Sequence, residues 1–168
     1  CKYCEDKYLK EIVMPNILLG RIDNRLVHGQ VGVTWTKTIG CNLIVVVDDE
    51  LVNDKLQQDL MAMTADNAGV QIRFFSIQKT IDVIYKAADS QKIFIVTKTP
   101  QVMLALIEGN VPIKTVNVGN MHFSNGKKQL SKKVYVDEDD MNSLRKIKSL
   151  GVDIFIQDVP GDIKESIE

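Results

Sequence analysis

One short stretch, residues 21–31, holds the side chains best suited to chemistry: two arginines, a carboxylate and an imidazole within eight residues. It follows an apolar strand candidate at 17–19 and precedes an apolar run toward Ile39 that has a helical pattern. In open α/β sheets, ligands bind at such strand-to-helix junctions. An imidazole there can attack phosphorus, and arginines can bind a phosphoryl group through two hydrogen bonds. A helix start adds free N–H groups and a positive dipole end, so the stretch indicates phosphoryl transfer.

Each polar residue of this stretch has a definite use if His28 carries a phosphoryl group. A neutral imidazole attacks phosphorus, forms a phosphohistidine and later gives the group to an acceptor, which splits one transfer into two. Asp23 is the candidate for holding one ring nitrogen in the correct tautomer, and Arg25 for neutralising the phosphoryl oxygens. Gly29 would let the backbone approach the phosphate. Gln30 would donate an amide hydrogen bond or face solvent from the helix.

The same stretch also has an interpretation without function. In a plain polar loop, Asp23 and Asn24 would cap a helix or face solvent, and polar clusters at helix starts mark functional sites only statistically. Residue types alone leave both interpretations open. Elsewhere, His122 is expected in a surface loop, and Trp35 in the core or at its flank.

Composition bounds the class of protein. A chain of 168 residues with 45% hydrophobic and 26% charged residues fits one domain with its own core. The formal net charge of −1 gives no electrostatic signature for nucleic acid or anionic membranes. No apolar run approaches the ~20 residues of a membrane helix, so a soluble protein is expected. The low cysteine count indicates a reducing, cytoplasmic compartment. Residues 1–13 lack the apolar segment of a secretory signal and are expected to be a disordered or artificial extension, with residues 14–168 as the single domain.

Metal and cofactor sites are not expected. Cys1 and Cys4 form a Cys-x-x-Cys pair, but no second ligand pair follows it and no strand precedes it, while Cys41 has the position of a buried thiol. His28 and His122 do not have the spacing of zinc ligands. The glycine-rich loops that bind nucleoside triphosphates or dinucleotides, and the Gly-x-Ser-x-Gly elbow, are absent from the sequence.

Strand and helix patterns alternate from Asn16 onward. Predicted strands span 17–19, 43–47, 70–75, 93–96, 113–118, 134–136 and 152–156. Predicted helices span 28–39, 51–63, 77–85, 100–107 and 137–150, with Gly40, Ser76, Pro100 and Asp137 as end signals. A long polar loop is expected at 119–128 and a polar tail after Gly161. The order predicts an α/β fold: an open, mostly parallel twisted sheet with helices on both faces.

Residues 21–31 are similar to the hallmark Arg-Ile-Asp-x-Arg-Leu-Ile/Val-His-Gly-Gln-Val of a bacterial family. This family is the sugar-specific IIB components of the mannose/fructose/sorbose/N-acetylgalactosamine class of the phosphoenolpyruvate-dependent phosphotransferase system. Further similarity lies in 46–50 with 53–54, in 98–100, in 112–114 with 117–119, and in 126–128 with 136–137, so the resemblance covers about 15–162. Two departures are Gly119-Asn120-Met121, where many members have Gly-Gly-Met, and a run after the second helix that lacks a frequent proline.

The resemblance implies that His28 accepts a phosphoryl group, preferentially on Nδ1, from the phosphohistidine of a IIA component. His28 would pass the group to the hydroxyl of a hexose or N-acetylhexosamine moved by the membrane components IIC and IID, at the inner face of the cell membrane. Asp23 and Arg25 would hold the active-site loop and the phosphate, and Asn24 is grouped with them. The resemblance also implies an antiparallel strand near one edge of the sheet, for which residues 119–130 and the strand at 134 are the candidates.

The remaining candidates are weaker. Asp48 and Asp49 end a strand, which favours helix capping over an acidic pocket. Lys98 ends another predicted strand at the same edge of the sheet as the His28 loop. Its side chain is expected either near a bound phosphate or in solvent. A receiver-like signalling domain would also use an acidic pair and a lysine, but residues 74–76 supply no aspartate to phosphorylate. A non-catalytic binding domain is the other alternative, and the choice of sugar and the oligomeric state, a homo-oligomer included, are left open.

Overall fold

The computed structural model describes residues 14–29 and 31–168, so the predicted extension at 1–13 and the side chain of Gln30 lie outside the described residues. Along the described chain the strands are β1 (Asn16–Asp23), β2 (Leu43–Val47), β3 (Gln71–Phe75), β4 (Lys92–Thr97), β5 (Thr115–Asn120), β6 (Lys128–Ser131), β7 (Val134–Val136), β8 (Asp153–Ile156) and β9 (Glu165–Ser166). Seven of them form one sheet in the order β3-β2-β4-β1-β5-β8-β9. All neighbours pair in parallel except β9, which runs antiparallel to β8. The predicted open, mostly parallel α/β sheet is confirmed.

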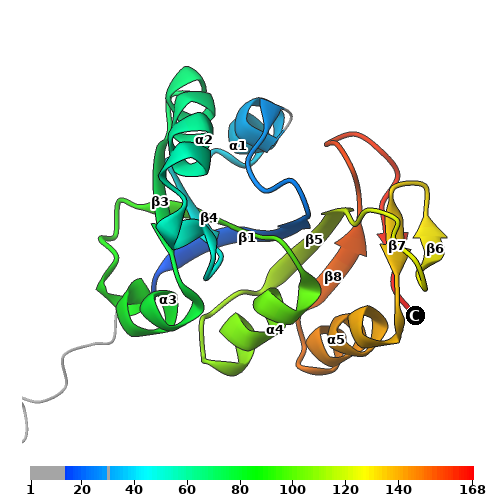
Figure 1. The fold of residues 1–168 in the computed structure, drawn as a ribbon. Coiled ribbons are helices and arrows are strands. Elements are labelled where there is room, and N and C mark those ends of the chain that lie inside the picture. The colour runs from blue at the N-terminus through cyan, green and yellow to red at the C-terminus, as the bar shows by residue number, and fades with distance from the viewer. Residues whose placement is uncertain (1–13, 30) are drawn as a thin grey trace, which may run out of the picture.

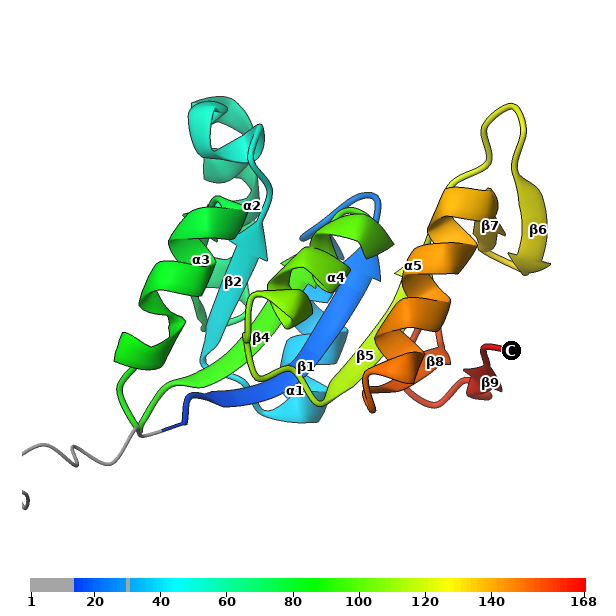
Figure 2. The ribbon, with the colours of Figure 1, turned by 90° about the horizontal axis from the view of Figure 1, so that it is seen from below.

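Helices cover both faces of this sheet (Figure 1). They are α1 (Thr36–Ile39), which continues a π-helical turn at Val31–Trp35, α2 (Lys55–Asn67), α3 (Ile77–Val83), α4 (Pro100–Glu108) and α5 (Glu138–Ser149), with short 3-10 turns at Leu51–Asn53 and Ile84–Lys86. Figure 1 shows α1 and α2 on one face, and Figure 2, seen from below, shows α3, α4 and α5 across the other. Two separate apolar clusters, one for each face, form the core. None of the helices in the described part of the chain is both long and apolar enough to cross a membrane.

The central strands are apolar on both faces, as parallel strands between two helical layers must be. Every residue of β2 is buried, and β4 is buried from its second residue onward. Helix ends follow the predicted signals. Gly40 has the left-handed φ of 70° after α1, and the side chain of Ser76 accepts a hydrogen bond from the backbone N–H of Lys79. Pro100 begins α4, and Asp137 caps α5 in a capping box with Asp140.

Three predictions about the second half of the chain need correction. The antiparallel edge strand is β9, which lies in the predicted polar tail, whereas the strand at 134 pairs with β6 in a separate two-stranded sheet. A two-residue strand is too short to leave a periodic pattern. The polar loop predicted at 119–128 is shorter, because β5 continues through Gly119 and Asn120 and β6 begins at Lys128. The strand predicted from 113 begins two residues later.

Near the N-terminus, β1 is longer than predicted. It begins at Asn16 and continues beyond the apolar residues 17–19 through Arg21, Ile22 and Asp23. Because β1 lies between β4 and β5, its polar end is still inside the sheet. Two of the charged residues assigned to a loop are therefore part of a central strand, which determines the geometry of the site.

Candidate active site

The alternation of side chains along β1 places Arg21 and Asp23 on one face of the sheet and Ile22 on the other. Ile22 packs in the cluster under α4 and α5, whereas Arg21 lies against Trp35 on the side of α1. The side chains of Arg21 and Asp23 are both closed off from solvent. Two charges therefore lie buried at the carboxyl end of a central strand, where open α/β sheets place their ligand sites.

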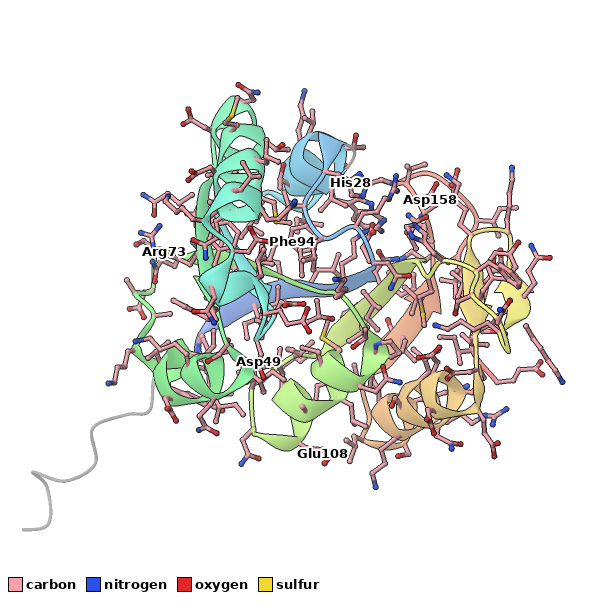
Figure 3. The ribbon with its side chains drawn as sticks, in the orientation of Figure 1. His28, Asp49, Arg73, Phe94, Glu108 and Asp158 are labelled. Carbon is pink, nitrogen blue, oxygen red and sulfur yellow. The ribbon has the colours of Figure 1, made fainter. Side chains whose placement is uncertain are left out.

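Asp23 connects these buried charges to His28. Its Oδ2 lies 3.1 Å from Nε2 of His28 and accepts a hydrogen bond from Nη2 of Arg21 at 3.1 Å. Its Oδ1 accepts the backbone N–H of Arg25 at 2.9 Å. The side chain of Asp23 is 0% exposed, whereas the imidazole of His28 is 21% exposed, so one edge of the ring is fixed from below and part of it faces solvent. Figure 3 shows His28 on the α1 side of the sheet.

Asn24 holds the loop between β1 and His28 against the neighbouring strands. Its backbone N–H donates to the carbonyl of Asn120 at 3.0 Å, and its side-chain Nδ2 donates to the carbonyl of Lys98 at 2.8 Å. Its Oδ1 accepts the backbone N–H of His122. Leu26 takes a left-handed backbone conformation with φ of 56°, and its buried side chain offsets the strain of that turn. The side chain of Asn24 thus orients the loop.

Sequence reasoning missed the group of residues around Arg21. The Arg21 guanidinium donates from Nη1 to Oδ1 of Asn117 at 2.5 Å and to the carbonyl of Gln157 at 3.2 Å. It lies 5.1 Å from the ring centroid of Trp35, and its Nη2 is 3.9 Å from Asp158. Arg21 was expected, with Arg25, to be able to bind a phosphoryl group, and complete burial makes this wrong. The available signal was Asn117, a polar residue inside an apolar strand.

Residues 17–168 match the family described as "PTS system sorbose subfamily IIB component". The chain belongs to this family. It is therefore a sugar-specific IIB component of the phosphotransferase system, a class of phosphotransferases that act in sugar uptake.

Similar proteins extend over nearly the whole chain of this IIB component. It is 66% identical to "N-acetylgalactosamine-specific phosphotransferase enzyme IIB component 1" of Escherichia coli (strain K12), over 91% of the chain and 97% of that protein. A crystal structure of the E. coli N-acetylgalactosamine-specific IIB component 1 matches with a TM-score of 0.89 and 65% identity, covering 91% of this chain and all of the other. The "PTS system mannose-specific EIIAB component" of E. coli is 35% identical over 87% of this chain and 45% of that longer protein.

Electrostatics in this IIB component favour an ionised Asp23. Burial alone would raise the pKa of Asp23. The hydrogen bond with His28, the charge of Arg21 and the backbone N–H of Arg25 outweigh burial, so the pKa lies below its ordinary value. Burial lowers the pKa of Arg21 and the neighbouring Asp23 opposes this, but a guanidinium stays charged in any case. An ionised carboxylate only accepts hydrogen bonds, so in the neutral imidazole of His28 it favours the tautomer with the proton on Nε2 and the lone pair on Nδ1.

Arg25 is the accessible cation of the site. Its side chain is 44% exposed, and its Nε is 3.8 Å from Oδ1 of Asp23. Arg25 lines a cavity of about 520 Å³ together with Lys98 and Asp48, the two weaker candidates. Oδ1 of Asp48 accepts the backbone N–H groups of Glu50 and Leu51, each at 2.9 Å, which is the expected capping role. The structure thus brings Lys98 and Asp48 beside Arg25 without contact to His28.

The remaining predicted residues add less. Gly29 follows His28 directly, and a Cβ built there would meet no atom within 4 Å, so local packing does not require a glycine. Gln30 lies outside the described residues. In the described part of the chain no three His, Cys, Asp or Glu side chains come together as metal ligands. The site consists of an imidazole, a buried carboxylate and an accessible guanidinium.

Proposed function

We propose that His28 is the phosphoryl carrier of this IIB component. It takes the group from the phosphohistidine of a IIA component and gives it to the hydroxyl of a sugar that the membrane components IIC and IID translocate. The observation that carries the proposal is the 3.1 Å contact between Nε2 of His28 and the buried carboxylate of Asp23. This contact leaves Nδ1 as the nucleophilic nitrogen of a partly exposed ring.

The chemistry needs no cofactor in addition to this chain, the IIA donor and the sugar bound by IIC and IID. The lone pair on Nδ1 of His28 attacks phosphorus, the new P–N bond forms, and the P–N bond of the donor histidine breaks with its electron pair left on the donor nitrogen. The ring of His28 becomes positively charged, and Asp23 stabilises that charge through Nε2–H. In the second step the sugar hydroxyl attacks phosphorus and loses its proton to a base at the sugar site, a P–O bond forms, and the P–N bond breaks with its electron pair left on Nδ1.

Arg25 supports both steps electrostatically. Its backbone N–H fixes one oxygen of Asp23, while its half-exposed guanidinium is free to reach an incoming phosphoryl group. A preorganised charge contact at the equatorial oxygens stabilises the transition state of phosphoryl transfer. The backbone after His28, from Gly29 onward, would supply further N–H donors. The closed part of the site holds the nucleophile, and the open part meets the phosphate.

The partner and the sugar are proposed from the similar proteins. The mannose-specific relative is named as an EIIAB component, which joins an A and a B component in one protein and supports a IIA partner. The relative with 66% identity is named for N-acetylgalactosamine. We therefore propose an N-acetylhexosamine, N-acetylgalactosamine in the first place, as the acceptor. Transfer to a sugar in IIC and IID would bring this chain to the inner face of the cell membrane.

Other nucleophiles of the described chain fit this role poorly. Cys41 is 7% exposed within the core cluster under α1 and α2, and burial raises the pKa of its thiol to about 11. A thiol in that state is a poor nucleophile at neutral pH. Asp48 and Asp49, which a receiver-like domain would use, accept backbone N–H groups at the starts of helical turns. Cys1 and Cys4 lie outside the described residues.

The test uses the two histidines of the chain as a matched pair. Radiolabelled phosphoenolpyruvate, the general phosphotransferase proteins and a IIA component are mixed with wild-type protein, His28→Gln or His122→Gln. We expect label on the wild type and on His122→Gln, and none on His28→Gln, because only His28 has the Asp23 contact. The bound label should be lost in acid and retained in base. Label that persists on His28→Gln, or that is lost in base as an acyl phosphate would be, would contradict the proposal.

A further inference from the structure

Arg21 is one of the largest fully buried side chains of the described protein, and its position is unusual for a charged group. Buried charges are costly unless they are paired and hydrogen-bonded. Only one of the partners of Arg21, Asp23, is a residue of the proposed active site. An arginine at this position must therefore provide something that an apolar side chain would not.

The two terminal nitrogens of Arg21 have different partners. Nη1 donates to Oδ1 of Asn117 at 2.5 Å and to the carbonyl of Gln157 at 3.2 Å. The same carbonyl receives Nδ2 of Asn117 at 2.9 Å, which closes a ring of hydrogen bonds between β5 and the segment after β8. Nη2 is left for Oδ2 of Asp23 at 3.1 Å. One side of the guanidinium is thus anchored to neighbouring strands, and the other side holds the carboxylate.

Packing fixes the plane of this guanidinium. Trp35 lies across it with 5.1 Å between Cζ and the ring centroid, and the indole N–H of Trp35 donates to the carbonyl of Asp158 at 2.9 Å. On another side lies Gly119, where a Cβ would come within 2.1 Å of Cζ of Arg21. Any side chain at position 119 would displace the guanidinium. Glycine is therefore required there by the arginine.

We infer that Arg21 is a positioning residue for the phosphoryl transfer: it fixes the Asp23 carboxylate so that Nε2 of His28 stays protonated and bound while Nδ1 faces the phosphoryl donor. The inference rests on the proposed role of His28. Arg21 itself touches neither His28 nor, being buried, the phosphoryl group. Without the Arg21 guanidinium, which is anchored through Nη1 and donates to Asp23 through Nη2, Oδ2 of Asp23 would lose the donor that fixes its direction. The imidazole would then sample both tautomers and present either nitrogen.

Lysine at position 21 would not position Asp23 in the same way. A single ammonium is a point charge, whereas the fork of a guanidinium can bind Asn117 and Asp23 at once from a fixed plane. Among residues 14–29 and 31–168, the charged groups that face the Asp23–His28 pair are Arg21 from β1 and Arg25 from the loop. Asp158, from the segment after β8, faces Arg21 at 3.9 Å and is itself paired with Lys133. Arg25 and Lys133 would remain in an Arg21 variant. The test therefore measures the effect of losing the Arg21 contact that orients Asp23, and not the effect of removing all positive charge.

The experiment compares four variants with the wild type. Arg21→Met removes the fork, Arg21→Lys keeps the charge without the fork, and Gly119→Ala keeps every side chain of the site but displaces the guanidinium. Arg73→Met is the matched control, because Arg73 lies at the outer edge of the sheet and bonds only to the carbonyl of Ile72 among the described residues (Figure 3). Thermal unfolding monitors the fold of each variant.

Three quantities are measured: the rate of label transfer from phosphorylated IIA, the nitrogen chemical shifts of the His28 ring, and the ring nitrogen that carries phosphate by phosphorus NMR. We expect Arg21→Met and Gly119→Ala to transfer about 10- to 100-fold more slowly, the usual effect of a second partner behind a reacting group. Arg21→Lys should fall between these variants and the wild type. Both slow variants should show mixed ring tautomers and some phosphate on Nε2, which a purely structural role would not produce.

Wild-type spectra alone test the inference if a variant fails to fold. A wild-type ring that carries its proton on Nδ1, or that exchanges between tautomers, would overturn it. Folded Arg21→Met or Gly119→Ala protein with the wild-type rate and a single tautomer would overturn it as well. In either case label would remain on His28 of the wild type. Failure of the proposed function would appear instead as the absence of label on His28 in every protein.

Discussion

The carboxyl ends of β1 and β2 lie at the same edge of one sheet with only β4 between them, and both carry aspartates. At the end of β1, Asp23 gives one oxygen to a backbone N–H and the other to the side chains of His28 and Arg21. At the end of β2, Asp48 accepts two backbone N–H groups, and Asp49 accepts the backbone N–H of Ile77. Figure 3 shows Asp49 on the α3 side of the sheet, opposite His28.

Burial and the kind of hydrogen-bond partner distinguish a carboxylate that takes part in the chemistry from one that caps a helix at a strand end. Helix starts need acceptors for their free N–H groups, and Asp48 and Asp49 meet that need where they lie partly or fully open to water. Asp23 is closed off from water and faces a cation and an imidazole, which lowers its pKa against the effect of burial. The carboxyl end of β1, which we call the reactive end, therefore differs from that of β2 in having a buried carboxylate with side-chain partners. Position at the sheet edge does not distinguish the two.

The strongest test of this comparison is Asp23→Asn. The amide has one acceptor oxygen for three donors, so the Arg21 fork, the Arg25 N–H or the His28 ring would lose its partner. Loss of the analogous aspartate charge behind a catalytic histidine lowers rates by about 10⁴, and we expect a loss between about 10² and 10⁴ in label transfer from phosphorylated IIA. Asp49→Asn is the matched control and should transfer at the wild-type rate. Equal rates for the two variants would erase the distinction between the two ends.

Arg25→Ala should have the next largest effect. The backbone N–H of Arg25 still holds Asp23 in this variant, so the fold and the ring orientation should persist while the accessible charge is lost. We expect transfer to slow by about 10²-fold, as for one preorganised charge contact. Single-turnover kinetics with phosphorylated IIA measure the rate, and Arg25→Lys should recover part of it. Unchanged kinetics in Arg25→Ala would remove the guanidinium from the mechanism.

Local signals made the reactive end predictable only in part. The spacing of Asp23, Arg25 and His28 is visible in the sequence because a strand end, a tight loop and a helix start follow each other within a few residues. Helix caps at Ser76 and Asp137 were predictable for the same reason, since a cap and its N–H donor lie three residues apart.

The support behind Asp23 depends on contacts that are distant in sequence. Arg21 meets Asn117 across 96 residues and the carbonyl of Gln157 across 136. Sequence patterns show that two arginines lie near His28, but only the strand order places Arg21 under Trp35 and leaves Arg25 in solvent. For the same reason the edge strand β9 was missed, because its pairing with β8 is long-range and its residues are polar.

The pH dependence of stability should separate the buried carboxylate from the others. The folded-state pKa of Asp23 lies below its ordinary value of 3.8, so Asp23 stabilises the fold above that value, and the contribution is lost as the pH falls through the lowered pKa. Asp140 has a lowered pKa as well: burial raises it, and hydrogen bonds from Gln101 and the Asp137 backbone, with Lys127 close by, outweigh burial. Two residues should therefore contribute to acid sensitivity in this range.

Urea unfolding of the wild type, Asp23→Asn and Asp140→Asn, measured from neutral pH to below 3.8, tests this account. Each variant should be less stable than the wild type at neutral pH, and the difference should shrink as the pH falls. Only Asp23→Asn should also lose label transfer, since Asp140 pairs with Lys127 and lies on α5, which covers the face of the sheet opposite His28. A difference that stays constant over the whole range would mean that folding does not lower the pKa of Asp23.

The smallest effect on transfer is expected for Asp48→Ala, at the carboxyl end of β2, where the aspartates accept backbone N–H groups. The change removes the oxygen that accepts the N–H groups of Glu50 and Leu51, and loss of such a cap costs about 1 kcal/mol of stability. Transfer from phosphorylated IIA should stay at the wild-type rate, because Asp48 shares a cavity wall with Arg25 but has no contact with His28. Urea denaturation and the transfer assay on the same preparation give both numbers. A loss of transfer as large as that of Arg25→Ala, without loss of stability, would show that Asp48 belongs to the reactive end and that capping does not distinguish the two aspartates.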